Sequence, residues 1–296
     1  MAKINGNDFA YSGNGSFKIN ETKTRIDPYY EDKIEYKEIL KELQDDIDAL
    51  QSMMYAHDRY GMLVVFQAMD AAGKDGTMKR VFSNVHPMGT GFYSFKRPSE
   101  KELDHDYMWR CYKELPERGK IKVFNRSYYE EVLVVKVHSE ILTQYQKIPE
   151  EISSKEDVWE KRYQDIKNFE EYLSNNGIVV VKFFLNVSKQ EQGRRLIARI
   201  EEQEKNWKFE EGDIKERAYW NDYQHAYEDL INKTSSKNAP WHIVPADDKK
   251  NMRLIVAQVI KEKLKSLDIH YPETTDERQA ELLKFIGIIE EQDRGL

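Results

Sequence analysis

The stretch MLVVFQAMDAAGKDGTMKRVF, residues 62–82, constrains the fold more than any other part of this chain. An apolar, largely β-branched run, residues 62–66, leads into a small-residue loop, residues 68–76, and a helical pattern follows. The order strand, loop, helix directs backbone N–H groups and a helix N-terminus toward a bound anion. Lys74 adds a positive charge at the same place. The stretch therefore predicts a phosphate-binding loop.

The loop departs from the standard Walker A pattern, G-x-x-x-x-G-K-[ST], at two positions. Ala68 replaces the first glycine, and Asp75 stands where a Ser or Thr would bind Mg²⁺. Asp70 adds a second carboxylate, and two carboxylates beside a phosphate repel it strongly unless a cation lies between them. Asp70 and Asp75 are therefore the predicted Mg²⁺ ligands, because Mg²⁺ favours carboxylate and phosphate oxygens together. The alternative is a polar turn at the start of a helix that binds nothing. The predicted phosphate-binding residues are Ala71, Ala72, Gly73, Lys74, Asp75, Gly76 and Thr77.

Composition limits the class of protein. A length of 296 residues allows one large domain, and a net charge of −7 argues against general binding of nucleic acid, which leaves a basic footprint. Cys111 is the single cysteine, which fits a reducing compartment and predicts a buried thiol in a helix. No apolar run approaches the length of a membrane span, and the N-terminus lacks a signal-peptide pattern. We therefore expect a cytoplasmic protein with no membrane partner.

Strands and helices alternate along the sequence. A polar leader, residues 1–27, is expected to be loosely attached, and residues 28–296 are expected to form one domain with a lid at about residues 188–220. The predicted helices cover residues 28–60, 99–115 (with a Ser99–Glu102 capping box), 158–175, 249–267 and two stretches that begin at Ser188 and at Asp213. The predicted strands cover residues 62–66, 121–124, 178–185 and 240–245. This alternation predicts an α/β fold with a parallel sheet flanked by helices.

A second cluster of polar residues, FNRSYYE, begins at Phe124 and follows a predicted strand. Open α/β sheets place ligand groups at such a strand end. Asn125 stands where a Walker B aspartate is usual, and Arg126 is predicted to bind phosphate oxygens. Glu130 and Glu131 follow at what looks like a helix start, where plain stabilisation by the helix dipole is the alternative role.

The helix that begins at Ser188 carries three arginines. Arg195 and Arg199 lie four residues apart on one face, and Arg194 projects to the side. A basic face of this kind is often only a solvated surface. Its position after a strand is also typical of the lid of nucleoside-monophosphate kinases, in which arginines close over the transferred phosphoryl group.

These motifs together resemble the family-2 polyphosphate kinases, which are related in fold to thymidylate kinase. The resemblance covers about residues 28–268, and it rests on AMDAAGKDGT, FNRSYYEEVLVVKVH, FFLNVSKQEQ, KNWKF, GDIKERAYWNDYQHAYED and APWHIVPADDK. The form FNRSYYE, with Asn125 where other members have Asp, resembles the third class, whose members act on both AMP and ADP.

The resemblance implies a reversible, Mg²⁺-dependent, in-line phosphoryl transfer from inorganic polyphosphate to AMP and ADP, which makes ADP and ATP. It implies a thymidylate-kinase-like, P-loop kinase-like fold with a helical lid, and a homo-oligomer. The catalytic residues would be Asp70, Lys74, Arg126, Arg194, Arg195 and Arg199, and the nucleotide-binding residues would be Asn125, Arg126, Glu130 and Glu131. Two alternatives are an ATP-dependent nucleoside-monophosphate kinase and a nucleotide-binding regulator without turnover.

Overall fold

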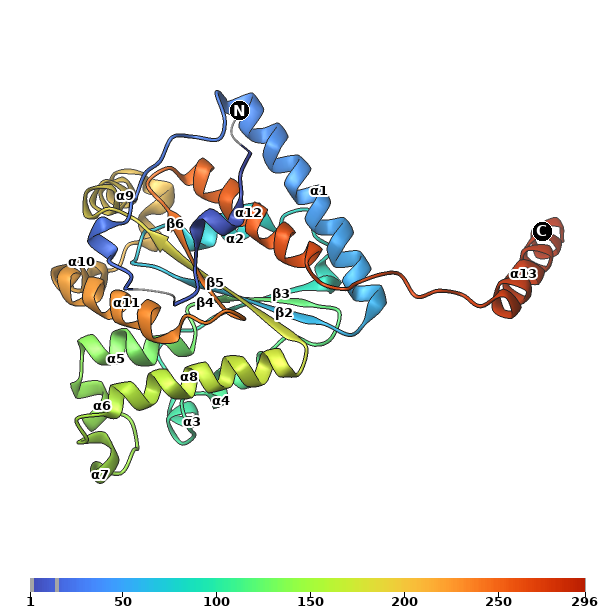
Figure 1. Cartoon of the computed structure of the whole chain (residues 1–296). Coiled ribbons are helices and arrows are strands. Elements are labelled where there is room, and N and C mark those ends of the chain that lie inside the picture. Colours follow the sequence, from blue (N-terminus) through green and yellow to red (C-terminus); the bar gives the residue numbers. More distant parts are fainter. Residues whose placement is uncertain (1–2, 14–15, 296) are drawn as a thin grey trace.

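The centre of the molecule is a six-stranded sheet with helices on both faces (Figure 1). The structure is a computed structural model and describes residues 3–13 and 16–295. The strands are β1 (Ala10–Tyr11), β2 (Gly61–Gln67), β3 (Thr90–Ser94), β4 (Ile121–Asn125), β5 (Ile178–Asn186) and β6 (Trp241–Pro245). Their order in the sheet is β1-β6-β5-β2-β4-β3, and only the pairing of β1 with β6 is antiparallel. The predicted α/β fold with a parallel sheet is confirmed.

The central strands are the apolar runs that the sequence predicts. All residues of β2 are buried, and Val64 lies opposite Val123 of β4 and Val181 of β5. A strand in the middle of a parallel sheet has both faces covered, so an almost continuous apolar sequence is stable there. Because β2 lies in the middle of the sheet, the loop that follows it opens at the centre of the C-terminal edge.

Two groups of helices cover the sheet (Figure 1). Helices α1, α2 and α12 lie over one face, and α5, α8 and α11 lie over the other. The helices are α1 (Lys33–His57), α2 (Lys74–Val81), α3 (Glu100–Leu103), α4 (Trp109–Tyr112), α5 (Val134–Val137), α6 (Glu140–Gln144), α7 (Glu150–Ser153), α8 (Val158–Asn175), α9 (Lys189–Glu201), α10 (Glu211–Ala218), α11 (Trp220–Thr234), α12 (Lys249–Lys265) and α13 (Asp276–Arg294). The 3₁₀ helices are η1 (Gly6–Phe9), η2 (Ile19–Glu21), η3 (Pro87–Gly89), η4 (Tyr128–Val132) and η5 (Gln203–Lys208).

Three predicted helices have other boundaries in the structure. The first helix begins at Lys33 rather than at residue 28, because the Asp32 carboxylate accepts hydrogen bonds from two N–H groups of its first turn. The predicted helix 99–115 is two single turns, α3 and α4, although its Ser99–Glu102 capping box is present. The chain breaks there because the Asp106 side chain binds the Met108 N–H and so competes with the helix.

The helix predicted to begin at Asp213 is also divided. Helix α10 begins two residues earlier, at Glu211, and the predicted stripe of Tyr223, Tyr227 and Leu230 belongs to α11. Asp213 therefore lies inside a helix, where its carboxylate binds Arg199 instead of capping the backbone.

The expectation of a loosely attached leader is wrong. β1 pairs with β6, and Ile4, Phe17 and Ile19 are buried in the main core. Farther along, the Thr24 carbonyl accepts a hydrogen bond from the Asp247 N–H at 3.0 Å. The described part of residues 3–27 therefore packs along the sheet edge and the loop that follows β6.

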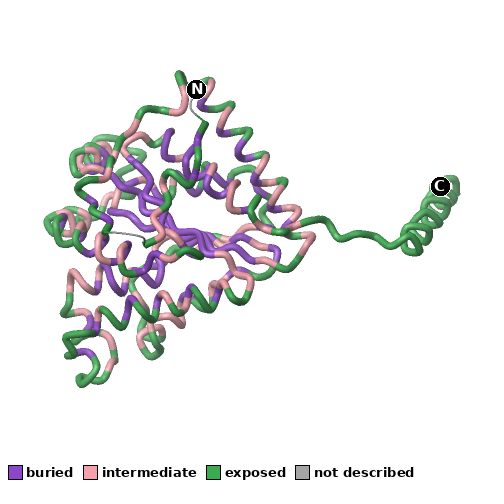
Figure 2. The backbone as a smooth tube through the Cα atoms, viewed as in Figure 1, coloured by how far each residue is buried: buried purple, intermediate pink, exposed green. Residues whose placement is uncertain are grey.

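The C-terminal helix α13 lies apart from the rest of the molecule (Figures 1 and 2). Every residue from Tyr271 to Gly295 is exposed, including all of α13. Helix α13 therefore adds nothing to the core that holds the sheet.

Candidate phosphoryl-transfer site

A cleft of about 850 Å³ opens at the C-terminal edge of β2, β4 and β5. Many of the predicted site residues line it: Asp70, Ala71, Gly73, Lys74, Asp75, Gly76, Asn125, Arg126, Arg194, Arg195 and Arg199. Several basic residues that the sequence analysis did not assign to the site line it as well: Lys96, Arg97, Lys205, Lys208, Lys249 and Arg253. The cleft is therefore a confined basic region in an acidic protein, which suits a polyanion.

The loop after β2 has the backbone shape of an anion-binding turn. Ala71 and Gly73 have positive φ angles of 61° and 109°, and helix α2 begins at the next residue, Lys74. The first N–H groups of α2 have no partner within the helix, and Lys74, Asp75 and Gly76 of its first turn line the cleft. Thr77 and Ala72 are fully buried, and the Thr77 hydroxyl donates to the Gly73 carbonyl, so both support the loop from behind.

Lys74 lies folded against its own loop. Its ammonium group donates to the carbonyl oxygens of Ala68 at 2.8 Å and Met69 at 3.4 Å, and the residue is 9% exposed. Burial lowers the pKa of Lys74 below its usual value, although the Asp70 carboxylate opposes this shift. The positive charge therefore lies directly under the loop.

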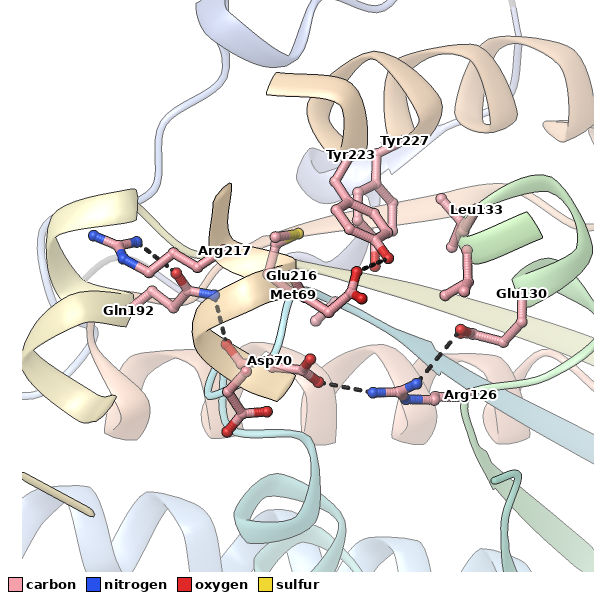
Figure 3. A pocket seen from close by; sticks show the side chains of 13 residues that line it. Met69, Asp70, Arg126, Glu130, Leu133, Gln192, Glu216, Arg217, Tyr223 and Tyr227 are labelled. Carbon is pink, nitrogen blue, oxygen red and sulfur yellow. Dashed lines mark hydrogen bonds and ion pairs between the residues drawn. The ribbon is translucent and has the colours of Figure 1, made fainter. Parts of the chain in front are cut away.

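Arg126 links the loop to the segment after β4 (Figure 3). It donates to the Asp70 carboxylate at 2.8 Å and lies 3.7 Å from the Glu130 carboxylate. Its φ is positive, at 64°, which is uncommon for a residue with a side chain, and its N–H donates to the Phe66 carbonyl of β2. Burial tends to raise the pKa of Asp70, but the charges of Lys74 and Arg126 outweigh it and hold that pKa below its ordinary value.

Oxygen atoms suited to a hard cation gather at the other end of the loop. The Asn125 amide group donates to the Asp75 carboxylate at 2.8 Å, while the buried Asn125 Oδ1 has no partner. Among the described residues, no three His, Cys, Asp or Glu side chains form a metal-binding cluster. Mg²⁺ is usually held by one or two carboxylates together with substrate phosphates, so Asp75 and the unpartnered Asn125 oxygen fit that ion, whereas Asp70, at the start of the loop, is bonded to Arg126.

The three arginines of α9 have different environments. Arg194 is exposed and pairs with Glu191 at 2.6 Å, and Arg199 pairs with Asp213 of α10 at 2.8 Å. Arg195 is buried, and its guanidinium donates to the carbonyl oxygens of Ala71, Ala72, Ala246 and Asp247. Arg195 therefore joins the phosphate loop to the loop after β6.

The side chain of Gln192 connects the same loop to α10 (Figure 3). Gln192 is buried, its amide group donates to the Asp70 carbonyl at 3.1 Å, and its own oxygen accepts from Arg217 at 2.7 Å. A pocket of about 170 Å³ lies at this junction, and Tyr223 and Tyr227 of α11 form part of its wall. Helix α9 thus contacts the loop directly through Gln192, and α10 is linked to the loop through its bond to the same side chain.

A second, more apolar pocket of about 550 Å³ adjoins the cleft. Its lining includes Phe95, Tyr107, Tyr128, Leu103, Val134, Val135, Ile141 and Tyr145, together with Arg126, Glu130 and Glu131. Glu130 therefore faces this pocket rather than the basic cleft. Glu131 is buried and its carboxylate is held by Arg162 at 3.0 Å, so it also stabilises the pocket floor.

The basic cleft residues that the sequence did not predict have only weak signals in the sequence. Lys96 and Arg97 precede a proline after β3, and Lys249 and Arg253 are four residues apart at the start of α12. Each pair follows the carboxyl end of a parallel strand, where ligand groups collect. The buried Cys111, in contrast, is confirmed as a packed thiol, and burial raises its pKa well above the ordinary value.

A parallel sheet, a phosphate loop after its central strand and a basic cleft define a P-loop kinase-like phosphotransferase. Residues 30–272 match the family model described as "Polyphosphate kinase 2 (PPK2)". The chain therefore belongs to the polyphosphate kinase 2 family, as the sequence motifs predict. Phosphotransferases of this family generally need a divalent metal ion.

Individual proteins agree with this assignment. The chain is 49% identical to the ADP-polyphosphate phosphotransferase of Rhodopseudomonas palustris over 95% of this chain and 97% of that protein. It is 42% identical to the AMP/ADP-polyphosphate phosphotransferase of Meiothermus ruber over 81% of this chain and 86% of that protein. The crystal structure of polyphosphate kinase 2 from Arthrobacter aurescens TC1 matches with a TM-score of 0.85, at 34% identity over 95% of both chains.

A membrane-spanning helix is not found in residues 3–13 or 16–295, since each helix there is too short or too polar to cross a bilayer.

Proposed function

We propose that this protein transfers a phosphoryl group from inorganic polyphosphate to AMP and ADP, in a reversible, Mg²⁺-dependent reaction that makes ADP and ATP. Membership of the polyphosphate kinase 2 family supports the donor, and the names of the two relatives support adenine nucleotides as acceptors. The relative with 49% identity is named for ADP alone, whereas the one with 42% identity is named for AMP and ADP. The form FNRSYYE, with Asn125, favours the third class and both acceptors.

The observation that carries the proposal is the position of Arg126 between two unlike cavities. Its side chain lines both the basic cleft of about 850 Å³ and the aromatic pocket of about 550 Å³. A chain of phosphates suits the first cavity, and a flat apolar base suits the second. The proposed arrangement places polyphosphate in the cleft and the nucleotide base in the pocket, with the reacting phosphates meeting at Arg126, near Asn125 and Glu130.

The chain's own residues account for the main requirements of the reaction. The attacking group is an ionised phosphate, so catalysis needs alignment and neutralisation of charge rather than a strong base. Lys74, the N–H groups of Gly73 and Gly76 and the start of α2 would hold phosphate oxygens. Asp70 would set the orientation of Arg126, to which it is bonded at 2.8 Å.

A metal ion held by Asp75 and the Asn125 oxygen would neutralise phosphate charge when bound. Helices α9 and α10, with η5 between them, form the proposed lid at about residues 188–220. In that lid Arg194 and Arg199, whose only partners among the described side chains are Glu191 and Asp213, would turn toward the phosphates. Arg195 would act through the loop that it supports.

The proposed setting is the cytoplasm, and the proposed partners are polyphosphate, the nucleotides AMP, ADP and ATP, and further copies of the chain. A net charge of −7 disfavours nucleic acid as a partner. The buried, unpaired thiol of Cys111 is compatible with a reducing compartment.

The test supplies polyphosphate and Mg²⁺ with AMP alone or ADP alone, without ATP, and follows products by chromatography. We expect ADP and ATP from AMP, and ATP from ADP. Arg126→Ala should lower kcat about 10²–10³-fold, because it removes a positively charged hydrogen-bond donor at the reacting phosphates. Arg118→Ala is the control, because Arg118 lies on the surface away from the cleft lining and binds the Arg59 carbonyl.

Each result separates the proposal from its rivals. A reaction of AMP with ATP but not with polyphosphate would make the protein an ordinary nucleoside-monophosphate kinase. Nucleotide binding without any product would make it a regulator. Product from ADP but not from AMP would keep the donor and exclude the third class.

A further inference from the structure

The lid is attached to the rest of the molecule at two neighbouring points. Helix α9 begins after Ser188, close to the end of β5, and α10 leads into α11 at Trp220. The Lys189 ammonium lies 5.9 Å from the centre of the Trp220 ring, so the entry and the exit of the lid lie side by side. The position of the lid over the cleft therefore depends on how firmly these two points are held.

The N-terminal segment of residues 17–24, which we call the strap, binds helix α11. Its 3₁₀ helix η2 lies against α11 (Figure 1), and Phe17 and Ile19 are buried. Glu228 of α11 accepts a hydrogen bond from the Ile19 N–H at 2.9 Å. Asn232, one turn later, accepts from the Phe17 N–H at 2.7 Å and donates to the Phe17 carbonyl at 2.9 Å. The strap is thus fixed to the helix that follows the lid.

The other end of the strap binds the entry of the lid. Asn186, the last residue of β5, donates to the Thr22 carbonyl at 3.3 Å. The Thr24 hydroxyl donates to the Asp247 carboxylate at 2.9 Å, and the same carboxylate accepts from the Ser188 N–H at 2.8 Å. Ser188 is the N-cap of α9. Asp247 therefore joins the strap to the first residue of the lid helix.

The same chain of contacts reaches the phosphate loop. The Asp247 carbonyl accepts from the Arg195 guanidinium at 3.2 Å, and that guanidinium also donates to the carbonyls of Ala71 and Ala72. The strap, both attachments of the lid and the phosphate loop are therefore connected by hydrogen bonds. Such a connection matters for catalysis, because a displacement of roughly 1 Å at reacting groups can cost about 10²-fold in rate.

We propose that the strap is a positioning element for the lid, and that Glu228 and Asp247 are the positioning residues through which it acts. It fixes α11 relative to Ser188, so that the arginines of α9 reach the phosphates held by the loop. Neither positioning residue lines the basic cleft, and the strap lies outside residues 30–272, which match the family model. The inference rests on the proposed function only in the role that it gives the lid.

The test compares two matched carboxylates. Glu228 accepts the Ile19 N–H at 2.9 Å and Glu262 of α12 accepts the Gly6 N–H at 3.0 Å, so each binds the N-terminal segment, but only Glu228 binds the strap. With polyphosphate, Mg²⁺ and ADP, Glu228→Ala should lower kcat roughly 10-fold at a temperature where the variant is fully folded. Glu262→Ala should keep the parent kcat. Glu228→Gln should recover most of the rate, because its amide oxygen still accepts from Ile19.

A second pair of variants tests the joint at Asp247. Asp247→Ala removes the link between Thr24 and Ser188 and should lower kcat as Glu228→Ala does. Asp247→Asn should keep most of the rate, because its oxygen can accept from the Ser188 N–H while its amide group donates to the Thr24 hydroxyl. Glu228→Ala should also cost less in an Arg199→Ala background, because the arginine that the strap positions is then absent.

Hydrogen exchange gives a readout that needs no turnover. The amides of α9 and α10 should exchange faster in Glu228→Ala and Asp247→Ala than in the parent or in Glu262→Ala. A parent that is inactive with polyphosphate would overturn the proposed function, and the exchange rates would still decide whether the strap holds the lid. Parent-like exchange in Glu228→Ala would overturn the strap's role in either case.

The kinetic outcomes are equally decisive for an active parent. An unchanged kcat in Glu228→Ala, whatever its unfolding temperature, would reduce the strap to an element that only stabilises the fold. An equal loss in Glu262→Ala would assign the effect to general loosening of the N-terminal segment. Strictly additive losses with Arg199→Ala, or an Asp247→Asn variant as slow as Asp247→Ala, would also overturn the proposal.

Discussion

Arg195 shows that the direction of a side chain decides whether an arginine is buried in the structure or exposed at the surface. Arg194, Arg195 and Arg199 look alike in the sequence, yet only Arg195 is buried against backbone carbonyls. Its position is set by the loop after β6, about fifty residues farther along, which supplies the carbonyls of Ala246 and Asp247. Periodicity within one helix cannot reveal such a contact, because the partner lies on another element.

We therefore predict that replacing each of the three arginines by alanine affects stability and activity differently. Arg195→Ala should lower the free energy of unfolding by roughly 3 kcal/mol, because several buried carbonyls and Glu191 lose a charged donor. Arg194→Ala should change it by less than about 0.5 kcal/mol, because that side chain is 63% exposed. Arg199→Ala should mainly lower kcat. Urea unfolding and steady-state kinetics measure the two effects. Equal stability of the Arg195 and Arg194 variants would contradict the assigned role of Arg195.

Strand β5 and helix α8 are joined by a buried ion pair. The Lys182 ammonium lies 2.6 Å from the Glu170 carboxylate, and the two side chains are 0% and 2% exposed. Lys182 also donates to the Tyr129 hydroxyl and to the Thr234 carbonyl, and Tyr128 and Tyr129 donate to Glu170. The network holds β5, α8 and α11 in register behind the site.

Breaking this pair from one side should be costly. Lys182→Met leaves a buried carboxylate without its cation and should lower the free energy of unfolding by about 3–5 kcal/mol. Lys182→Met/Glu170→Gln removes the unpaired charge and should recover part of that loss. Denaturant midpoints of the two variants and the parent give the comparison. If Lys182→Met lowered the free energy of unfolding by less than about 1 kcal/mol, the ion pair would not contribute to stability as proposed.

At the scale of elements, the sequence predicts what is long and buried and misses what is short or at an edge. The runs 121–124 and 178–185 are confirmed as β4 and β5, because burial on both faces leaves an apolar signature. β1 and β3 are missed, since the two residues of β1 are too few for a pattern and the edge strand β3 has no fully buried residue. In the site, Asp70, Lys74 and Arg126 are found from local motifs. The basic residues from separate loops are not found in this way, because the order of the strands in the sheet decides whether they reach the site.

For the whole molecule, His242 in β6 links stability to pH. It is buried, and its ring lies against the Lys182 carbonyl and near the charges of Lys182 and Lys263. Burial is the main cause that lowers its pKa to about 4 in the folded state. The unfolded chain binds a proton near pH 6.5, so between about pH 6.5 and 4 the unfolded state holds more protons than the folded state.

Stability should therefore fall as the pH falls through that window. The contribution of His242 approaches roughly 3 kcal/mol near pH 4, from a pKa difference of about two units or slightly more. His242→Gln should flatten the pH dependence of the unfolding free energy there, whereas the same change at the exposed His225 should not. Urea titrations at a series of pH values test this. A parallel pH dependence in His242→Gln and parent would refute the linkage.

The pairing of Ala10 with His242 has a consequence for biosynthesis. During translation the first strand emerges from the ribosome with nothing to bond to, because its neighbour is made only after more than three quarters of the chain. Closing so distant a contact is slow compared with forming local helices. Strand β1 therefore cannot complete its pairing until β6 has been synthesised.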